Sequence, residues 1–293
     1  MSRRQVLRLI PPLLAAAHAL VPPTASLDAA SLAAPPAPRK PPPAPSKPLP
    51  SVFSLPAPSL RASLVSAAQS MNASGLNHGT AGNLSARHGD GFLITPSGVP
   101  YATMGGGDVA AVDLRGESSY YGGLPPSSEW RFHRDVYLNF PEAGAIVHTH
   151  SPYASALSCV SGGIPPFHYY VALFGGKCVP RAAYATFGSQ ELSDNIVAAL
   201  REHGVCACLM GNHGVVVVAA SVEKALALAG EVENLARMLS IARGFGEVQV
   251  MSDEEMEVVL AKVKTYGKKD VDLGCMCEFD RKHRIVPPPR GDA

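Results

Sequence analysis

A short apolar run that ends in a His-x-His pair, residues 144–150, constrains this chain more than any other feature. An apolar run of this length between turn-forming residues predicts a buried strand. Because side chains alternate between the two faces of a strand, His148 and His150 are expected to point to the same side. Two neighbouring imidazoles at a strand end can bind one metal ion, and a catalytic zinc takes three protein ligands and keeps an open position.

Further donors for such a site lie elsewhere in the chain. His213 lies in a Gly-Asn-His-Gly turn between two apolar runs, and Glu129 begins a predicted helix before the His-x-His strand. Three histidines, one glutamate and one open position would make a working metal site. Taken singly, a His-x-His pair is often two partly exposed imidazoles, and a histidine in a turn is usually an ordinary polar residue. The joint occurrence of these residues favours the metal site.

The N-terminal segment differs in composition from the rest. Residues 1–50 contain 13 of the 27 prolines and six basic side chains against one acidic one. This composition is typical of a mitochondrial or plastid transit peptide, and the alternatives are a secretory signal or an untargeted cytoplasmic chain. Its apolar part is too short and too interrupted to span a membrane. We expect a targeting or disordered Pro/Ala-rich segment at 1–58, a catalytic domain at 59–267 and a tail at 268–293.

The remainder of the chain is mildly acidic, with 19 basic and 23 acidic side chains in residues 51–293. This balance gives no reason to expect nucleic acid as a partner. About 240 residues suffice for one α/β core. The six cysteines are unevenly spaced in a large domain, which argues against a disulfide framework and for a reducing compartment. Cys206 and Cys208 lie two apart in an apolar run, where we expect small buried side chains.

Hydrophobic periodicity, caps and turn residues predict a mixed order of helices and strands. Ser127 or Ser128, Ser189 and Ser221 are expected to cap helices, and residues 252–255 form a capping box. Residues 205–210 and 215–219 are expected to pair as a hairpin. The predicted fold class is α/β, with a mainly antiparallel central sheet flanked by helices. The strands are expected at 92–95, 108–114, 145–149, 205–210 and 215–219, and the helices at 60–71, 129–139, from 152, at 190–202, 222–241 and 253–266.

Three loops rich in small polar residues could hold an anion. They are residues 80–83, within a stretch at 79–85 that we expect to form a tight loop, residues 95–98, and Ser127 with Ser128 at a helix start. Hydroxyls, backbone N–H groups and the positive end of a helix dipole can hold a phosphate without lysine or arginine. Each such loop taken alone is more often an ordinary turn or cap.

Six segments together resemble the class II aldolase/adducin family. Their sequences are Leu-Asn-His-Gly-Thr-Ala-Gly-Asn at 76–83, Leu-Ile-Thr-Pro-Ser-Gly at 93–98, Leu-Pro-Pro-Ser-Ser-Glu-Trp-Arg-Phe-His at 124–133, Val-His-Thr-His at 147–150, Tyr-Ala-Thr-Phe-Gly at 184–188 and Lys-Thr-Tyr-Gly at 264–267. They occur in the family's order, and the resemblance runs from about residue 60 to residue 267.

The resemblance implies roles for individual residues. It implies one Zn²⁺ per subunit, bound by His148, His150 and His213, and a general acid/base at Glu129, which occupies the open zinc position until substrate displaces it. It implies a homotetramer with active sites between subunits, in which Tyr169 acts from the neighbouring subunit. The expected phosphate-binding residues are Thr80, Asn83, Ser97, Gly98, Ser127 and Ser128, and those at the aldehyde end are Phe187 and Tyr266.

The implied activity is cleavage of L-fuculose 1-phosphate, or a related ketose 1-phosphate, to dihydroxyacetone phosphate and L-lactaldehyde. The substrate would be a small phosphorylated sugar, and neither nucleic acid nor membrane is expected as a partner. The alternatives are a pentulose-5-phosphate 4-epimerase, in which an aspartate takes the place of Glu129, a methylthioribulose-phosphate dehydratase, and a non-catalytic adducin-like scaffold. Asn212, where the family pattern has a histidine, departs from it. Around Tyr169, the sequence also departs from the family pattern at Tyr170, Leu173 and Phe174. These departures put the aldehyde specificity in doubt.

Overall fold

The computed structural model describes residues 57–115, 120–121, 124–160 and 162–263. These residues belong to one structural unit. The predicted targeting segment up to residue 56, Tyr266 and the tail at 268–293 lie outside the described residues. In the part of the chain that the structure describes, no helix is both long and apolar enough to cross a membrane.

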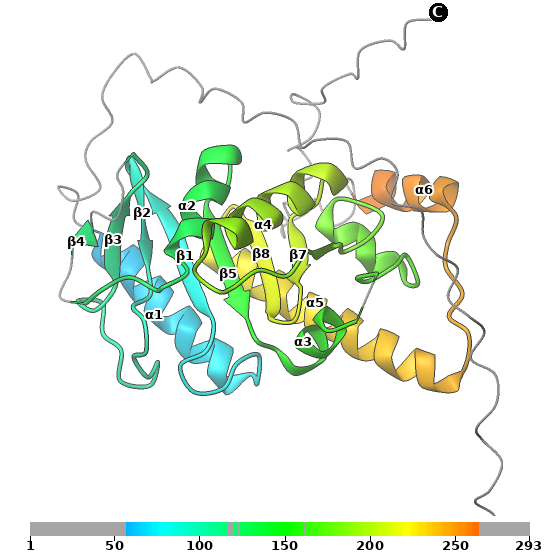
Figure 1. Ribbon diagram of the computed structural model, residues 1–293, viewed down its shortest axis with the longest axis horizontal. Coiled ribbons are helices and arrows are strands. Elements are labelled where there is room, and N and C mark those ends of the chain that lie inside the picture. The colour runs from blue at the N-terminus through cyan, green and yellow to red at the C-terminus, as the bar shows by residue number, and fades with distance from the viewer. Residues whose placement is uncertain (1–56, 116–119, 122–123, 161, 264–293) are drawn as a thin grey trace, which may run out of the picture. The chain divides into compact units, whose positions relative to one another are not determined.

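A mixed sheet forms the centre of the fold (Figure 1). Its strand order is β4-β3-β2-β1-β5-β8-β7-β6, and every neighbouring pair is antiparallel except β6 and β7. The predicted α/β class with a mainly antiparallel sheet is therefore confirmed. The strands are β1 (Asn83–His88), β2 (Gly91–Ile94), β3 (Ala110–Asp113), β4 (Tyr120–Tyr121), β5 (Ala145–Thr149), β6 (Arg181–Ala182), β7 (Ala207–Met210) and β8 (Gly214–Ala219).

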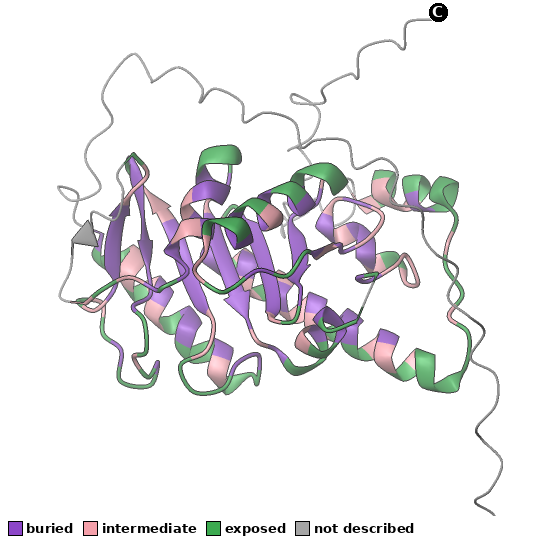
Figure 2. Ribbon diagram, in the orientation of Figure 1, coloured by how far each residue is buried: buried purple, intermediate pink, exposed green. Residues whose placement is uncertain are grey.

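Helices cover both faces of the sheet, and β5, β7 and β8 are buried throughout (Figure 2). One face packs against α1, α3 and α5, and the other against α2 and α4. The helices are α1 (Pro58–Ala73), α2 (Trp130–Asn139), α3 (Pro152–Ser158), the 3₁₀ helix η1 (Tyr169–Phe174), α4 (Gln190–His203), α5 (Val222–Phe245) and α6 (Asp253–Val263).

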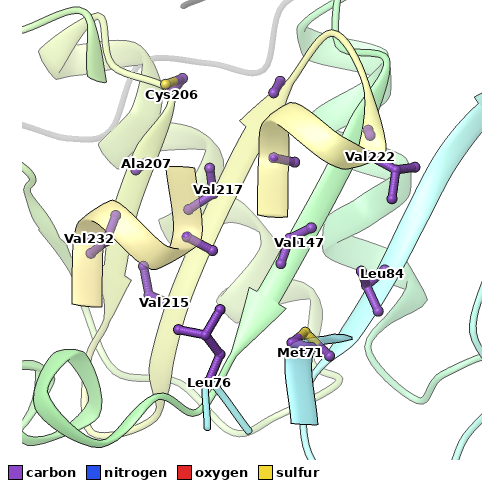
Figure 3. Close-up of a cluster of buried hydrophobic side chains, with 14 of the residues drawn as sticks. Met71, Leu76, Leu84, Val147, Cys206, Ala207, Val215, Val217, Val222 and Val232 are labelled. Carbon is purple, nitrogen blue, oxygen red and sulfur yellow. The ribbon is translucent and has the colours of Figure 1, made fainter. Parts of the chain in front are cut away.

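Alternation along the strands divides the core into two layers. Val147, Val215 and Val217 point toward α5, where Val232 joins them (Figure 3). The residues between them on the strands, Ile146 among them, face α2 and α4 instead. His148 is two residues beyond Ile146 and therefore points to the α2 side of the sheet.

The helix caps that depend on neighbouring residues agree with prediction. Ser189 accepts a hydrogen bond from Leu192 N at 3.1 Å, and Ser221 accepts one from Lys224 N at 3.3 Å. In the capping box, Ser252 N donates to Glu255 Oε2 at 3.1 Å and Glu255 N donates to Ser252 Oγ at 3.2 Å. The predicted hairpin is also present as β7 and β8.

Two predictions about the local structure are wrong. Helix α2 begins at Trp130 with Glu129 as its N-cap, and neither Ser127 nor Ser128 caps it. Ser127 instead pairs its backbone N–H with Thr95 O at 3.0 Å, and its hydroxyl accepts from Glu129 N at 3.3 Å. The predicted tight loop at 79–85 ends at Gly82, because Asn83–His88 pairs with both β2 and β5. The strand alternates polar and apolar side chains, but residues such as Asn83, Ser85 and Ala86 have low strand propensity, so the signal is weak.

Candidate active site

Three histidines converge at one end of the central strands. His148 is on β5, His150 follows that strand, and His213 lies in the turn between β7 and β8. Antiparallel pairing of β5 with β8 places Thr149 opposite Val215, so the turn lies beside the end of β5. One nitrogen of each histidine lies within 4.8 Å of the others, and among the described residues this is the group suited to hold a metal ion.

The distances fit four donors around one ion. The Nε2 atoms of His148 and His150 are 3.0 Å apart. Glu129 Oε2 lies 3.2 Å from His148 Nε2, and Glu129 Oε1 lies 3.6 Å from His213 Nε2. Ligands at about 2.0 Å from a tetrahedral zinc lie about 3.3 Å from one another. The buried Glu129 Oε1 has no hydrogen-bond partner among the described residues, as a ligand atom aimed at a cation would.

The protonation states suit metal binding. His148 Nδ1 donates to Val215 O at 3.0 Å, which turns Nε2 toward the other ligands. Burial, with help from His148, lowers the pKa of His150 and of His213 to about 4, so both are neutral at pH 7. Burial opposes ionisation of Glu129, but His148, His213 and Asn83 lower its pKa to about 2. Burial also opposes a charge on His148, yet Glu129 raises its pKa, and a cation would take the place of that proton.

Asn77 ties the loop before β1 to the histidines. Its Oδ1 accepts from His150 N at 2.6 Å, and its Nδ2 donates to Ala81 O at 3.0 Å. Gly82 has φ +69° and leaves no room for a Cβ beside Asn77 Nδ2 and His148 O. Asn77 therefore holds His150 and the pocket loop in one arrangement. Asn77 is buried and had no predicted role, although it lies within the motif at residues 76–83.

A pocket of about 360 Å³ adjoins the histidines. The three predicted polar loops meet in it, and α2 begins at its wall. Tyr184, Ala185 and Asn212, which had no predicted binding role, also line it. Among the predicted residues, those that line it are Thr80, Asn83, Ser97, Ser127, Ser128, Glu129, His150, His213 and Phe187.

Three predicted residues of the described part of the chain are not among those lining the pocket. His148 is buried behind it. Gly98 follows Ser97 but does not line it. Tyr169, at the start of η1, is 51% exposed and does not line this pocket either, so its action from a neighbouring subunit of a homotetramer stays a prediction. Tyr266 lies outside the described residues.

The comparison with protein families decides the identity of this fold and site. The family described as "Class II Aldolase and Adducin N-terminal domain" matches residues 62–240, which is more than half of the chain. The chain belongs to the class II aldolase/adducin family. All three histidines, Glu129 and the polar loops lie inside the matched segment.

Relatives within the class II aldolase/adducin family carry the names of aldolases. The chain is 46% identical over 209 residues to the 5-methylthioribulose-1-phosphate/5-deoxyribulose-1-phosphate aldolase of Rhodospirillum rubrum, covering 71% of this chain and 93% of the relative. It is 45% identical over 194 residues to the L-fuculose phosphate aldolase of Escherichia coli K12, covering 66% and 88%. A solved structure named L-fuculose 1-phosphate aldolase matches with a TM-score of 0.68 and 34% identity, covering 71% and 98%.

These comparisons support a metal-dependent class of enzyme. Class II aldolases depend on a metal, and the His148, His150 and His213 cluster is where this family member offers ligands for one. Family members act on small phosphorylated sugars, which accords with polar loops around the pocket.

Proposed function

We propose that this chain is a zinc-dependent aldolase. Its substrate is a ketose 1-phosphate whose end remote from the phosphate is apolar, and the enzyme cleaves the bond between C3 and C4. Candidate substrates are 5-methylthioribulose 1-phosphate, 5-deoxyribulose 1-phosphate and L-fuculose 1-phosphate, which the names of its relatives suggest. Each would give dihydroxyacetone phosphate and an aldehyde. The observation that carries the proposal is the cluster beside a polar pocket in which the ligand nitrogens of three histidines lie within 4.8 Å of one another. The carboxylate oxygens of Glu129 lie 3.2 Å from His148 Nε2 and 3.6 Å from His213 Nε2.

The polar loops suit the phosphate end of such a substrate. Thr80, Ser97 and Ser127 come from three separate segments and line one pocket. Hydroxyls and the N-terminal end of a helix attract an anion, and α2 starts here. At the other end of the substrate, the exposed rings of Tyr184 and Phe187 at the pocket suit a methyl or methylthio group better than a second charged group.

The proposed cleavage requires two proton transfers. As the C3–C4 bond breaks, the C4 hydroxyl loses its proton and becomes the aldehyde, while the bonding electrons remain on C3. Protonation of C3 then completes dihydroxyacetone phosphate, so nothing else is consumed. A divalent cation held by the three histidines supplies Lewis-acid stabilisation of the charge that develops on the ketose oxygens. We assign to Glu129 the transfer of these protons, because it is ionised and its Oε1 makes no hydrogen bond to the described residues. Displacement of the carboxylate from the cation by substrate would raise its basicity.

The substrate assay separates this proposal from its alternatives. The zinc-loaded chain is incubated with each of the three ketose 1-phosphates, and dihydroxyacetone phosphate is measured with a coupled reductase. We expect release from at least one of them, with the highest kcat/KM identifying the substrate. Epimerisation of a pentulose 5-phosphate without cleavage would favour the epimerase. Zinc binding with neither reaction would contradict an aldolase.

Replacement of Glu129 tests its proposed role. Glu129→Gln keeps the shape of the side chain but removes its basicity, so we expect kcat to fall by about 10²–10⁴. The metal content should remain near one per chain, because three histidine ligands remain. Glu142→Gln, at an exposed position, is the matched control and should leave kcat unchanged. Full activity of Glu129→Gln would exclude it as the general acid/base.

A further inference from the structure

A ladder of polar side chains runs between β1 and α2. Every second residue of a strand lies about 6.6 Å further along it, and every fourth residue of a helix about 6.0 Å further. Side chains with these spacings on a packed strand and helix therefore stay opposite one another. This protein has polar side chains at every second residue of β1 and at every fourth residue along α2. They are Asn83, Ser85 and Arg87 on β1, and Glu129, His133 and Tyr137 at the start of α2 and along it.

The members of this ladder are linked by a continuous chain of hydrogen bonds. Asn83 Nδ2 lies 3.0 Å from Glu129 Oε2, and Asn83 Oδ1 lies 2.6 Å from His133 Nε2. On the other side of the ring, His133 Nδ1 lies 2.7 Å from Ser85 Oγ, which lies 2.8 Å from the Tyr137 hydroxyl. All five side chains are buried. Glu129 is therefore connected to a network well below the pocket.

The chemistry of these groups allows one direction for each hydrogen bond. Asn83 Oδ1 can only accept, so His133 Nε2 carries the proton. Burial, together with His148, lowers the pKa of His133 to about 3, so the ring is neutral and its Nδ1 must accept. Ser85 then donates to His133 Nδ1 and accepts from the Tyr137 hydroxyl. Every group in the chain is paired in this one arrangement.

This arrangement fixes the orientation of the Asn83 amide. If the amide rotated by half a turn while His133 kept its tautomer, its NH₂ group would face the His133 N–H, and its oxygen would face the Glu129 carboxylate. Two donors and two acceptors would then oppose each other in a buried site, which is strongly unfavourable. Asn83 also lines the pocket. One hydrogen of its NH₂ group bonds Glu129 Oε2, and this bond leaves the second hydrogen for another acceptor.

We propose that His133 is a positioning residue, which holds the Asn83 amide so that this amide keeps Glu129 Oε2 turned toward His148. The inference rests on the proposed function, because it concerns the group that moves protons in that reaction. His133 has no contact with the pocket and acts only through Asn83. A purely structural His133 would contribute to the stability of the buried network without affecting the Glu129 carboxylate.

Two substitutions of His133 separate these roles. The amide nitrogen of His133→Gln can take the place of Nε2 and donate to Asn83, whereas the shorter His133→Asn reaches only the place of Nδ1. We expect His133→Asn to lower kcat by about 10–100-fold, as loss of a partner behind a metal site does, with a smaller change in KM because Asn83 also lines the pocket. His133→Gln should restore most of kcat. His203→Gln and His203→Asn, at an exposed residue in the last turn of α4, are the matched controls.

A double-mutant cycle tests whether His133 acts through Glu129. In a Glu129→Gln background, His133→Asn should cause little further loss of kcat, because the carboxylate it positions is already gone. If both His133 variants lost the same activity, or if the two losses multiplied in full, His133 would be structural only. Should His133→Asn fail to fold, Ser85→Ala tests the hydrogen-bond series from the other side of the His133 ring. We expect a smaller loss of kcat, which should likewise vanish in the Glu129→Gln background.

A measurement without substrate keeps this inference separate from the proposed function. The full chain and its variants are loaded with Co²⁺, and the visible spectrum reports the donors around the ion. We expect His133→Asn to shift the spectrum toward that of Glu129→Gln, and His133→Gln to resemble the unchanged chain. This result would support the positioning role even if no ketose phosphate were cleaved. A spectrum of His133→Asn identical to that of the unchanged chain would overturn it.

Discussion

Gly214 shows how tightly the backbone packs around the histidines. A Cβ at this position would clash with Thr149 O and would lie 3.2 Å from both His148 Cε1 and His150 Cδ2. These contacts come from strand pairing, since Gly214 opens β8 beside the end of β5. The requirement for glycine here is therefore one of space between two ligands.

The Gly214→Ala substitution should weaken metal binding. The added methyl group would push the two imidazoles apart, so we expect an affinity loss of about tenfold or more, measured by competition with a chromogenic chelator. Gly230→Ala is the control, because a Cβ there meets no atom within 4 Å and the residue lies inside α5. It should keep the metal affinity and raise the free energy of unfolding by about 0.5–1 kcal/mol. Equal metal affinity in both variants would contradict this account.

At the scale of residues, the sequence predicts ligands better than the groups that hold them. His148 and His150 follow from the two-residue repeat of a strand, and His213 from its turn between apolar runs. Asn77 reaches His150 across 73 positions, and His133 reaches Asn83 across 50. Such contacts depend on strand order and helix placement, and no local pattern encodes them.

Helix α3 begins directly after the metal-binding segment and is held by a residue from another helix. Ser151, its N-cap, makes no side-chain cap hydrogen bond. Glu233 of α5 instead accepts from Tyr153 N at 2.9 Å and from Ala154 N at 2.8 Å. A carboxylate at a helix N-terminus pairs with free N–H groups and with the positive end of the dipole. Glu233 thereby anchors the segment that follows His150.

The Glu233→Ala substitution should destabilise this element. Loss of a cap costs about 0.5–2 kcal/mol, so we expect the free energy of unfolding in urea to fall by that amount. Because His150 lies just before α3, the metal affinity should fall as well. Glu202→Ala, at an exposed position of α4, should change neither quantity. Unchanged stability of Glu233→Ala would show that α3 is held by packing alone.

At the scale of elements, the sequence predicts helix caps that form within one turn. It does not predict caps formed by residues from distant segments. Ser189, Ser221 and the 252–255 box are confirmed because each cap bonds a residue three positions away. The predicted serine cap of α2 was wrong because the Ser127 backbone N–H bonds Thr95 O, which lies on a distant segment. Strand β1 was missed because Asn83, Ser85 and Ala86 have low strand propensity, so the alternation of polar and apolar side chains along it gives only a weak signal.

For the molecule as a whole, the candidate metal ion would join segments far apart in the chain. It would link the end of β5 to the β7–β8 turn, and Glu129 would add α2. We therefore expect chelation to lower Tm and added Zn²⁺ to restore it. A ligand that binds the folded state at a thousand times its Kd contributes about 4 kcal/mol of stability. His150→Ala should lose most of this zinc-dependent rise, and an unchanged Tm after complete metal removal would contradict a stabilising site.

The class of the fold follows from the sequence, whereas the arrangement of its strands does not. The β7–β8 hairpin and the Ser-capped helices predict an antiparallel sheet between helices. The placement of β1 between β2 and β5, and of β8 beside β5, depends on which apolar faces pack together. That placement brings Asn83 opposite His148 and so assembles the site.

None of the described residues that line the pocket is a lysine or an arginine. A doubly charged phosphate group would thus meet hydroxyl and amide dipoles in the described lining of the pocket, and a cation held by the histidines would add a full positive charge beside it. Affinity for the sugar phosphate and affinity for the cation would then be thermodynamically linked, each raising the other by the same factor. In such a design the metal-free protein would bind phosphate esters more weakly than the metal-loaded protein, and one ion would affect both recognition and chemistry.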